Sequence, residues 1–331
     1  MSRVTSRKLK KRKVRLRRFI TLTIMAAIVI FVYKSIIPSI EQHKFNNSYD
    51  DNIVQLPVVY VEPDVSISIS SDNLYSSNAI LLSLKDQTIL MEKNIEEKIY
   101  PASLTKMMTA IVAIENLTDL KQEIELTDSM FQGLYEANAS LAGFQPGEKV
   151  SAIDLIYGAL LPSGAESCVG LAYLVAGSEQ DFVRMMNQKA VELKMTNTNF
   201  ENTTGLHHEN HYTTVKDLAI LLSYSLQNNT FRDVFTSYSY STKPTNKHPD
   251  GITFYSTMFE KLKISNQSIV NGKILGGKTG FTDEAGLCLA SLARVDEKEY
   301  ILITVGAKGN HYTEQYNITD ALTVYNSIGK Q

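Results

Sequence analysis

The body of the chain opens with two short extended runs and one long apolar segment. Residues 78–84 and 88–93 are β-like runs separated by residues 85–87 (KDQ), a pattern that predicts a hairpin. Residues 104–117 (LTKMMTAIVAIENL) are apolar nearly all round, and a helix with that pattern is buried on every side. The sequence therefore places a buried central helix soon after a hairpin.

Helical periodicity continues through the middle of the chain, and strand-like runs return near its end. Helices are expected at 152–161, 167–175, 180–193, 214–226 and 312–328, and strands at 287–295 and 300–306. Thr213 or Thr214 is the expected N-cap of the fourth helix, with Asp217 in its first turn. The pattern predicts an α+β fold, in which one sheet is built from both ends of the body, is flanked by helices and carries an inserted, mainly helical subdomain.

The N-terminal 40 residues combine a basic block with an apolar run. They contain 11 Lys or Arg residues and no acid, and residues 19–33 (FITLTIMAAIVIFVY) are apolar or carry a hydroxyl. A span needs about 20 residues, and three isoleucines between positions 36 and 40 extend the run. Because positive charge precedes it, we predict a cytoplasmic tail at 1–18 and a transmembrane signal anchor at 19–40 of a single-pass bacterial membrane protein. A cleaved signal peptide is the alternative, but no small-residue cleavage site follows the run.

The remainder of the chain is acidic and poor in cysteine. Residues 41–75 are polar and are expected to form an extracytoplasmic stalk, with strand character near 65–69. Residues 41–331 hold 22 basic and 35 acidic side chains, a net charge of −13, which argues against nucleic acid as a partner because phosphate binding needs positive surface. Two cysteines, Cys168 and Cys288, are too few for a disulfide scaffold. Two buried thiols are favoured, and a single disulfide remains open.

The first candidate for chemistry is the run Ser103-Leu104-Thr105-Lys106 at the start of the central helix. Helix positions i and i+3 lie on one face, and a serine hydroxyl needs a base to become a nucleophile. Lys106 could be that base if its pKa fell from about 10.4, through burial or a nearby cation. The same S-x-x-K spacing recurs by chance at Ser327 and Lys330, so the spacing alone favours an ordinary helix N-cap.

Two further elements make the pattern more specific. Residues 161–165 (LPSGA) lie at an expected turn between two helices, and residues 276–282 (GGKTGFT) enter the terminal strand region. Glycines in a strand let a substrate backbone approach closely, so Lys278 and Thr279 are placed to bind a carboxylate. Lys278 would also be the cation that lowers the pKa of Lys106. Each element alone fits an ordinary loop or turn, but the ordered trio on an exported chain points to one active site.

The trio resembles that of the penicillin-binding proteins and serine β-lactamases. Within that group the chain is similar to the low-molecular-mass D-alanyl-D-alanine carboxypeptidases. The segments that carry the resemblance are 100–110 (YPASLTKMMTA), 146–150 (PGEKV), 160–164 (LLPSG), 200–206 (FENTTGL), 212–214 (YTT) and 217–219 (DLA). The resemblance runs from about residue 78 to residue 328. It implies a β-lactamase/transpeptidase-like fold for a catalytic domain at 76–331.

The resemblance implies a role for each motif residue. Ser103 would be acylated by a peptidoglycan stem peptide ending in D-Ala-D-Ala, with Lys106 as general base and Ser163 as the proton relay to the leaving amine. The implied substrate-binding residues are Lys278, Thr279, Gly280 and Phe281. The backbone N–H groups of Ser103 and Phe281 would form the oxyanion hole. No metal or other cofactor is implied, and β-lactams, which mimic the dipeptide, would acylate Ser103 as well.

Three departures from the family pattern keep alternatives open. Ala165 stands where the family usually has Asn, so an amide expected near Lys106 is missing. The chain stops at Gln331 where many relatives carry a β-domain and an amphipathic anchor, and the N-terminal segment is expected to replace that anchor. A family arginine near 306–310 has no counterpart, and Lys308 is the nearest cation. The alternatives are a β-lactamase-like hydrolase and a weakly active or inactive protein that binds cell-wall peptides.

Two other clusters invite comparison with known sites. Residues 207–211 (HHENH) place three histidines within five residues, but they match no zinc-peptidase spacing and occupy a loop of the family pattern. Glu166 resembles in type the glutamate that deacylates class A β-lactamases, but it lies only three residues after Ser163. We expect a loop in the first case and a non-catalytic glutamate in the second.

Overall fold

The computed structural model describes residues 69–265 and 268–328. The chain divides into two units, 1–58 and 59–331, and every described residue belongs to the second unit. The predicted tail, the predicted anchor and most of the predicted stalk therefore lie outside the described residues. Among the residues that are described, no helix has the length and apolar character needed to cross a membrane.

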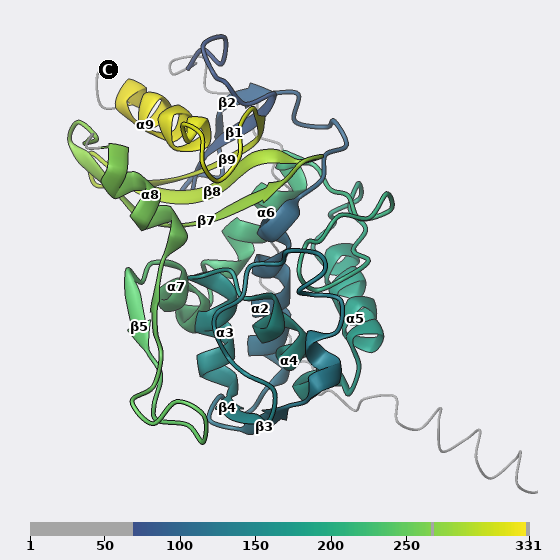
Figure 1. Cartoon of the computed structure of the whole chain (residues 1–331). Helices are drawn as coiled ribbons and strands as arrows, with labels where there is room; N and C mark the ends of the chain where they lie inside the picture. The colour runs from purple at the N-terminus through teal and green to yellow at the C-terminus, as the bar shows by residue number, and fades with distance from the viewer. Residues whose placement is uncertain (1–68, 266–267, 329–331) are drawn as a thin grey trace, which may run out of the picture. The chain divides into compact units, whose positions relative to one another are not determined.

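A five-stranded sheet, in the order β2-β1-β9-β8-β7, forms one layer of the body (Figure 1). Its strands are β1 (Asn78–Ser83), β2 (Ile89–Lys93), β7 (Gly272–Thr282), β8 (Gly286–Val295) and β9 (Lys298–Ala307). All neighbouring strands are antiparallel. The predicted hairpin and the predicted sheet from both ends of the body are confirmed. The strand order places β7, which carries the Lys278 motif, at one edge of the sheet.

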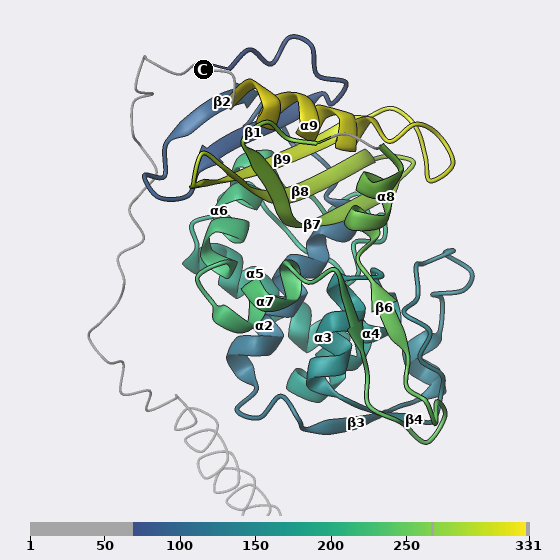
Figure 2. The same cartoon turned by 90° about the vertical axis from the view of Figure 1, so that its left-hand side faces the viewer.

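Successive side chains along these strands point to opposite faces of the sheet. Leu289, Ala293 and Val295 of β8 share one buried cluster with Leu302 of β9. Helices α8 (Thr257–Ser265) and α9 (Tyr316–Ile328) cover this face, and α6 (Val215–Ser225) covers the other (Figure 2). Apolar side chains at helical spacing on α9 complete the cluster: Ile318, Leu322 and Tyr325.

Helix α2 (Lys106–Asn116) is the centre of a second, helical layer. Its side chains from Met107 to Ile114 are all buried, as the apolar pattern predicts. The helices of this layer are α3 (Ala152–Leu160), α4 (Ala165–Ala176), α5 (Glu179–Glu192), α6 and α7 (Asn229–Phe235), and all five pack against α2. The start of α2 points toward β7 (Figure 1), and the turn of residues 102–105 just ahead of α2 contacts β7, so the helical layer and the sheet meet there.

Several short elements have no counterpart in the sequence-based expectations. They are the strand pairs β3 (Glu123–Leu126) with β4 (Glu148–Ser151) and β5 (Ser239–Ser241) with β6 (Thr253–Tyr255), the 3₁₀ helices η1 (Ala102–Thr105) and η2 (Asp128–Phe131), and the helices α7 and α8. Strands of three or four residues are too short to show an alternation, and their pairing partners are distant in sequence.

Two boundaries differ from the expected ones for identifiable reasons. The last helix begins at Tyr316 instead of residue 312, because Gln315 donates to the carbonyls of Asn310 and Thr313 and holds a turn ahead of it. At the N-terminal side, residues 69–75 lie on the sheet: Ile69 and Leu74 belong to the sheet core. The folded body therefore begins no later than residue 69, within the segment expected to be stalk.

Candidate active site

Ser103 lies in η1, one turn ahead of α2, and its side chain is half-buried. The Lys106 amine donates to Ser103 Oγ at 3.0 Å and to the Thr204 carbonyl at 2.6 Å. Lys106 itself is only 2% exposed. The predicted nucleophile and base therefore lie within hydrogen-bond distance, and a carbonyl from the loop at residue 204 fixes the direction of the amine.

The backbone turn that presents Ser103 is held by unusual conformations and close contacts. Ala102 has a φ of +46°, a left-handed conformation that persists in non-glycine residues only where the surroundings enforce it. Its carbonyl accepts from Thr105 Oγ1 at 2.8 Å and packs against Gly205, where any Cβ would overlap the Ala102 oxygen. Gly205 has a φ of +82°, so this position requires glycine on both grounds.

His211 extends this support beneath the turn. Its Nδ1 accepts the Glu201 N–H at 3.1 Å, so its Nε2 carries the proton and donates to Thr105 Oγ1 at 2.8 Å. Burial, with a smaller effect from neighbouring histidines and Lys106, lowers the pKa of His211 to about 4. The side chain is therefore a neutral structural donor, which agrees with the expectation that residues 207–211 form a loop.

Ser163 and Lys278 form the second pair of the site, 115 positions apart in sequence. Lys278 donates to Ser163 Oγ at 2.8 Å and to the Thr279 carbonyl at 2.8 Å. Ser163 lies between α3 and α4 with a φ of +71°, a strained conformation of the kind that concentrates at functional sites. Lys278 is completely buried. The structure thus brings the second and third predicted motifs together.

Strand β7 passes directly against the nucleophile turn. A Cβ on Gly280 would lie 3.1 Å from the Ser103 nitrogen, tighter than an ordinary contact. The backbones of Ser103 and of the Gly280–Phe281 segment are therefore neighbours, as two oxyanion-hole donors must be. The Phe281 ring packs edge-on against His311, with centroids 5.0 Å apart. The Thr279 hydroxyl is engaged by Thr257 Oγ1 at 2.8 Å.

The two buried lysines influence each other's protonation. Burial is the largest cause lowering the pKa of Lys106, and the nearby Cys168 and Glu166 raise it. Burial first, and then the Lys106 charge, lower the pKa of Lys278 well below its ordinary value. The two amines are therefore coupled, because a positive charge on either one disfavours a positive charge on the other.

The segment that follows Ser163 is tied to a neighbouring loop. Ala165, at the position where the family has Asn, is buried and donates its N–H to the Ser140 carbonyl at 2.8 Å. Glu166 Oε1 accepts the N–H groups of Ala142, Gly143 and Phe144 at 2.7, 2.9 and 3.3 Å. Its Oε2 is buried and has no hydrogen-bond partner among the described residues. Glu166 therefore anchors the 142–144 loop.

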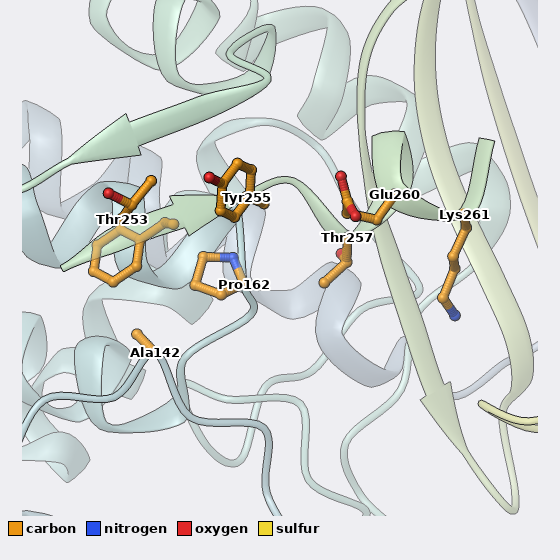
Figure 3. Close-up of a pocket in the computed structure, with 8 residues that line it drawn as sticks. Ala142, Pro162, Thr253, Tyr255, Thr257, Glu260 and Lys261 are labelled. Atoms are coloured by element: carbon orange, nitrogen blue, oxygen red, sulfur yellow. The ribbon is translucent and has the colours of Figure 1, made fainter. Parts of the chain in front are cut away.

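A pocket of about 380 Å³ opens beside the Ser163 and Thr279 segments. It is lined by Ala142, Pro162, Thr253, Phe254, Tyr255, Thr257, Glu260 and Lys261. Figure 3 shows Thr257, Glu260 and Lys261 following one another along α8 on one side, with Thr253 and Tyr255 of β6 on the other. Thr257 joins the pocket to the site, because its N–H donates to the Leu161 carbonyl at 3.1 Å.

The remaining candidates for chemistry are the possible metal ligands and the two cysteines. Within the described ranges no group of three His, Cys, Asp or Glu side chains is arranged to hold a metal ion. Cys168 and Cys288 are both buried and unbonded, so the expectation of two thiols is confirmed. Burial is the largest cause raising the pKa of each thiol to about 12.

Some residues of the site were not singled out by the sequence analysis. Thr204 and Gly205 lie in a segment that carried the resemblance, but nothing in the pattern assigned them to Lys106 and to the Ser103 turn. His211 was considered only as part of a histidine cluster. Thr257 and Lys261 lie on α8, a helix that the periodicity did not reveal. Their roles depend on packing between elements far apart in the sequence.

An antiparallel sheet that meets a helical layer at a Ser–Lys pair, with a second Ser–Lys pair beside it, is the arrangement of serine enzymes with a β-lactamase/transpeptidase-like fold. A family model described as D-alanyl-D-alanine carboxypeptidase matches residues 66–309, so the chain belongs to that family. The family resemblance drawn from the motifs is confirmed.

Individual relatives agree with this assignment. The D-alanyl-D-alanine carboxypeptidase DacF of Bacillus subtilis is 32% identical over 237 residues, which are 70% of this chain and 57% of the relative. The carboxypeptidase DacC of Escherichia coli is 32% identical over 69% of this chain and 56% of the relative. The chain thus spans somewhat more than half the length of these relatives.

The solved structure of the Streptomyces K15 DD-transpeptidase is also similar. It superposes with a TM-score of 0.70 at 25% identity, covering 78% of this chain and 98% of that chain. The predicted α+β, β-lactamase/transpeptidase-like fold is therefore confirmed.

Proposed function

We propose that this chain is a penicillin-sensitive serine D-Ala-D-Ala carboxypeptidase that removes the terminal D-alanine of peptidoglycan stem peptides. The observation that carries the proposal is the 3.0 Å contact between Lys106 Nζ and Ser103 Oγ, set against the edge strand that holds Lys278. Family membership supports the same chemistry. The catalytic unit is proposed to lie outside the cytoplasmic membrane and to begin no later than residue 69 instead of at residue 76, with residues 19–40 as its anchor and the part of the 41–75 segment before residue 69 as its stalk.

Acylation follows from the positions of the donors and acceptors. Neutral Lys106 accepts the Ser103 proton as Oγ attacks the carbonyl of the penultimate D-alanine. The oxyanion receives hydrogen bonds from the N–H groups of Ser103 and Phe281. The C–N bond then breaks, and Ser163 passes a proton to the leaving amine. D-alanine departs, and water hydrolyses the Ser103 ester to regenerate the hydroxyl.

The carboxylate of the substrate supplies the negative charge that Lys278 lacks in the free site. Lys278 is buried with two neutral acceptors, Ser163 Oγ and the Thr279 carbonyl, so its charged form is disfavoured. A carboxylate bound beside Thr279 stabilises a proton on Lys278. That charge in turn repels a proton on Lys106, which favours the neutral base. Substrate binding and base activation are therefore coupled through the two amines.

The position of Ala165 does not remove the support of the base. The Thr204 carbonyl already holds the Lys106 amine at 2.6 Å, so its orientation does not depend on a side-chain amide at residue 165. This observation favours a working enzyme over the weakly active peptide-binding alternative. A β-lactamase-like hydrolase would differ from it by releasing penicillin rapidly.

The test uses the full-length protein with fluorescent penicillin and a peptide ending in D-Ala-D-Ala. We expect covalent labelling that peptide mapping places on Ser103, slow loss of the label, and release of D-alanine. Ser103→Ala should abolish both labelling and release. Ser327→Ala, in the other S-x-x-K sequence of the chain, is the matched control and should change neither, because its hydroxyl only donates to the Thr323 carbonyl of its own helix.

Each contrary result selects an alternative. Rapid loss of the label indicates a β-lactamase. Peptide binding without release of D-alanine indicates a wall-binding protein. Labelling at any residue other than Ser103 contradicts the proposed mechanism.

A further inference from the structure

A cation on α8 lies beside the proposed carboxylate site. Lys261 lines the same pocket as Thr257 and Pro162. Thr257 hydrogen-bonds to Thr279, and Pro162 precedes Ser163. Helix α8 packs against β7, and Figure 3 shows Lys261 one turn after Thr257, on the far side of Glu260 from Tyr255 and Pro162. The Lys261 amine is close enough to Lys278 for its charge to lower the pKa of Lys278.

The charge of Lys261 has no counterion among the residues that the structure describes. Within the described residues its amine makes one hydrogen bond, to the neutral Oε1 of Gln315, and no ion pair. Partial burial lowers the pKa of Lys261, and its charge contributes to lowering the pKa of Lys278. Two amines that disfavour each other's charge, beside an open pocket, form a site that an anion would complete, because buried charges are normally paired.

We propose that Lys261 is a substrate-binding residue that, together with the Lys278–Thr279 segment, holds the terminal carboxylate of the peptide. The inference rests on the proposed function and adds a specificity residue to the same site. The Gln315 side chain holds the amine until a carboxylate replaces or shares that hydrogen bond. Lys308, the cation nearest to the position of the missing family arginine, is exposed and does not line the pocket.

The experiment compares a peptide ending in D-Ala-D-Ala with the same peptide carrying a C-terminal amide, using the full-length protein. Loss of a charged hydrogen bond to the carboxylate should lower kcat/KM of Lys261→Met about tenfold on the acid. The amide lacks the negative charge, so kcat/KM on the amide should stay within about twofold of the wild-type value. Lys261→Arg should restore most of the preference for the acid.

Lys263→Met is the matched control, since Lys263 lies on the same helix but is exposed and contacts Tyr238. It should retain the wild-type preference for the acid. Thermal unfolding of each variant shows whether the fold is kept.

An equal loss on both substrates, or no loss on the acid, would overturn the role of Lys261 while leaving the proposed function intact. A wild-type protein that fluorescent penicillin does not label would overturn the proposed function, and this inference with it.

Discussion

The nucleophile side and the carboxylate side of the site are built in opposite ways. The nucleophile side consists of the Ser103 turn, Lys106 and the residues that hold them. There Lys106 has two acceptors, Thr105 is held between Ala102 and His211, and Gly205 fixes the turn by close contact. Its geometry is complete before a substrate arrives.

The carboxylate side consists of Lys278, Thr279, Lys261 and the adjoining pocket. Its two amines have only neutral acceptors among the described residues. It lies on an edge strand and opens to a pocket of about 380 Å³. This side therefore becomes complete only when an anion binds.

This difference predicts that the nucleophile side determines the rate of acylation and that the carboxylate side determines which substrates are preferred. Changes on the nucleophile side should slow acylation by every substrate, because they alter the groups that form the bond. Changes on the carboxylate side should alter the preference for substrates with a free carboxylate.

Lys106→Met should have the largest effect. Removing a general base lowers rates by about 10²–10⁴-fold, so acylation by penicillin and by its methyl ester should both fall by about 10³-fold. Since burial lowers the pKa of Lys106 below 10.5, the wild-type acylation rate should rise with pH as Lys106 loses its proton. Stopped-flow or quenched labelling across pH measures both effects.

In Lys106→Met that dependence on pH should disappear, whereas the exposed Lys263→Met should keep it. A variant that loses activity only toward the free acid would contradict the assignment of Lys106 to the nucleophile side.

The contacts that follow from local geometry are the ones that could be predicted from sequence. The spacing of Ser103 and Lys106 places them on one face of a helix whatever surrounds it. The apolar run of α2 predicted its burial, and alternation predicted β8 and β9. These statements need only the periodicity of one element.

The contacts between distant elements could not be predicted in this way. Lys278 meets Ser163 across 115 positions, and Lys261 reaches the site from a helix without a strong pattern. The pKa values of Lys106 and Lys278 depend on the groups that the fold brings beside them. Glu166 and Cys168 lie near Lys106 only because of how α4 packs against α2, and one sequence does not contain that arrangement.

His211→Gln tests the support of the nucleophile turn through stability. The folded pKa of His211 is about 4, below the ordinary value of 6.5. A histidine with a lowered pKa contributes stability above pH 6.5 that is lost as the pH falls toward 4, because the unfolded chain binds the proton more readily. The loss should be about 3 kcal/mol of unfolding free energy.

Urea unfolding between pH 7 and pH 4 measures this loss. His211→Gln cannot titrate, so its stability should fall by about 3 kcal/mol less than that of the wild type over this range. His208→Gln, at an exposed position of the same loop, should keep most of the wild-type dependence, because burial and not the charge of His208 is the largest cause of the lowered pKa of His211. Parallel curves for His211→Gln and the wild type would show that His211 is not buried as a neutral donor.

Glu166→Gln should have the smallest effect. It is also the most direct test of whether the nucleophile side and the carboxylate side act separately. The Glu166 carboxylate raises the pKa of Lys106, because a nearby negative charge favours the ammonium form. Glutamine keeps the oxygen that accepts from Ala142, Gly143 and Phe144 but has no charge. The pKa of Lys106 should fall, and the acidic limb of the acylation profile should move to lower pH.

The matched control is Glu148→Gln, which removes another buried carboxylate that holds Thr245 and His248 instead. Glu148→Gln should leave the acidic limb of the acylation profile at the wild-type pH. Glu166 also anchors the loop that brings Ala142 to the pocket on the carboxylate side, so its variant can affect either side. A shifted acidic limb with an unchanged preference for the free acid assigns Glu166 to the nucleophile side. If the preference for the free acid changes while the acidic limb of the acylation profile stays in place, the two sides are not separable. Glu166 would then affect substrate recognition without changing the pKa of Lys106.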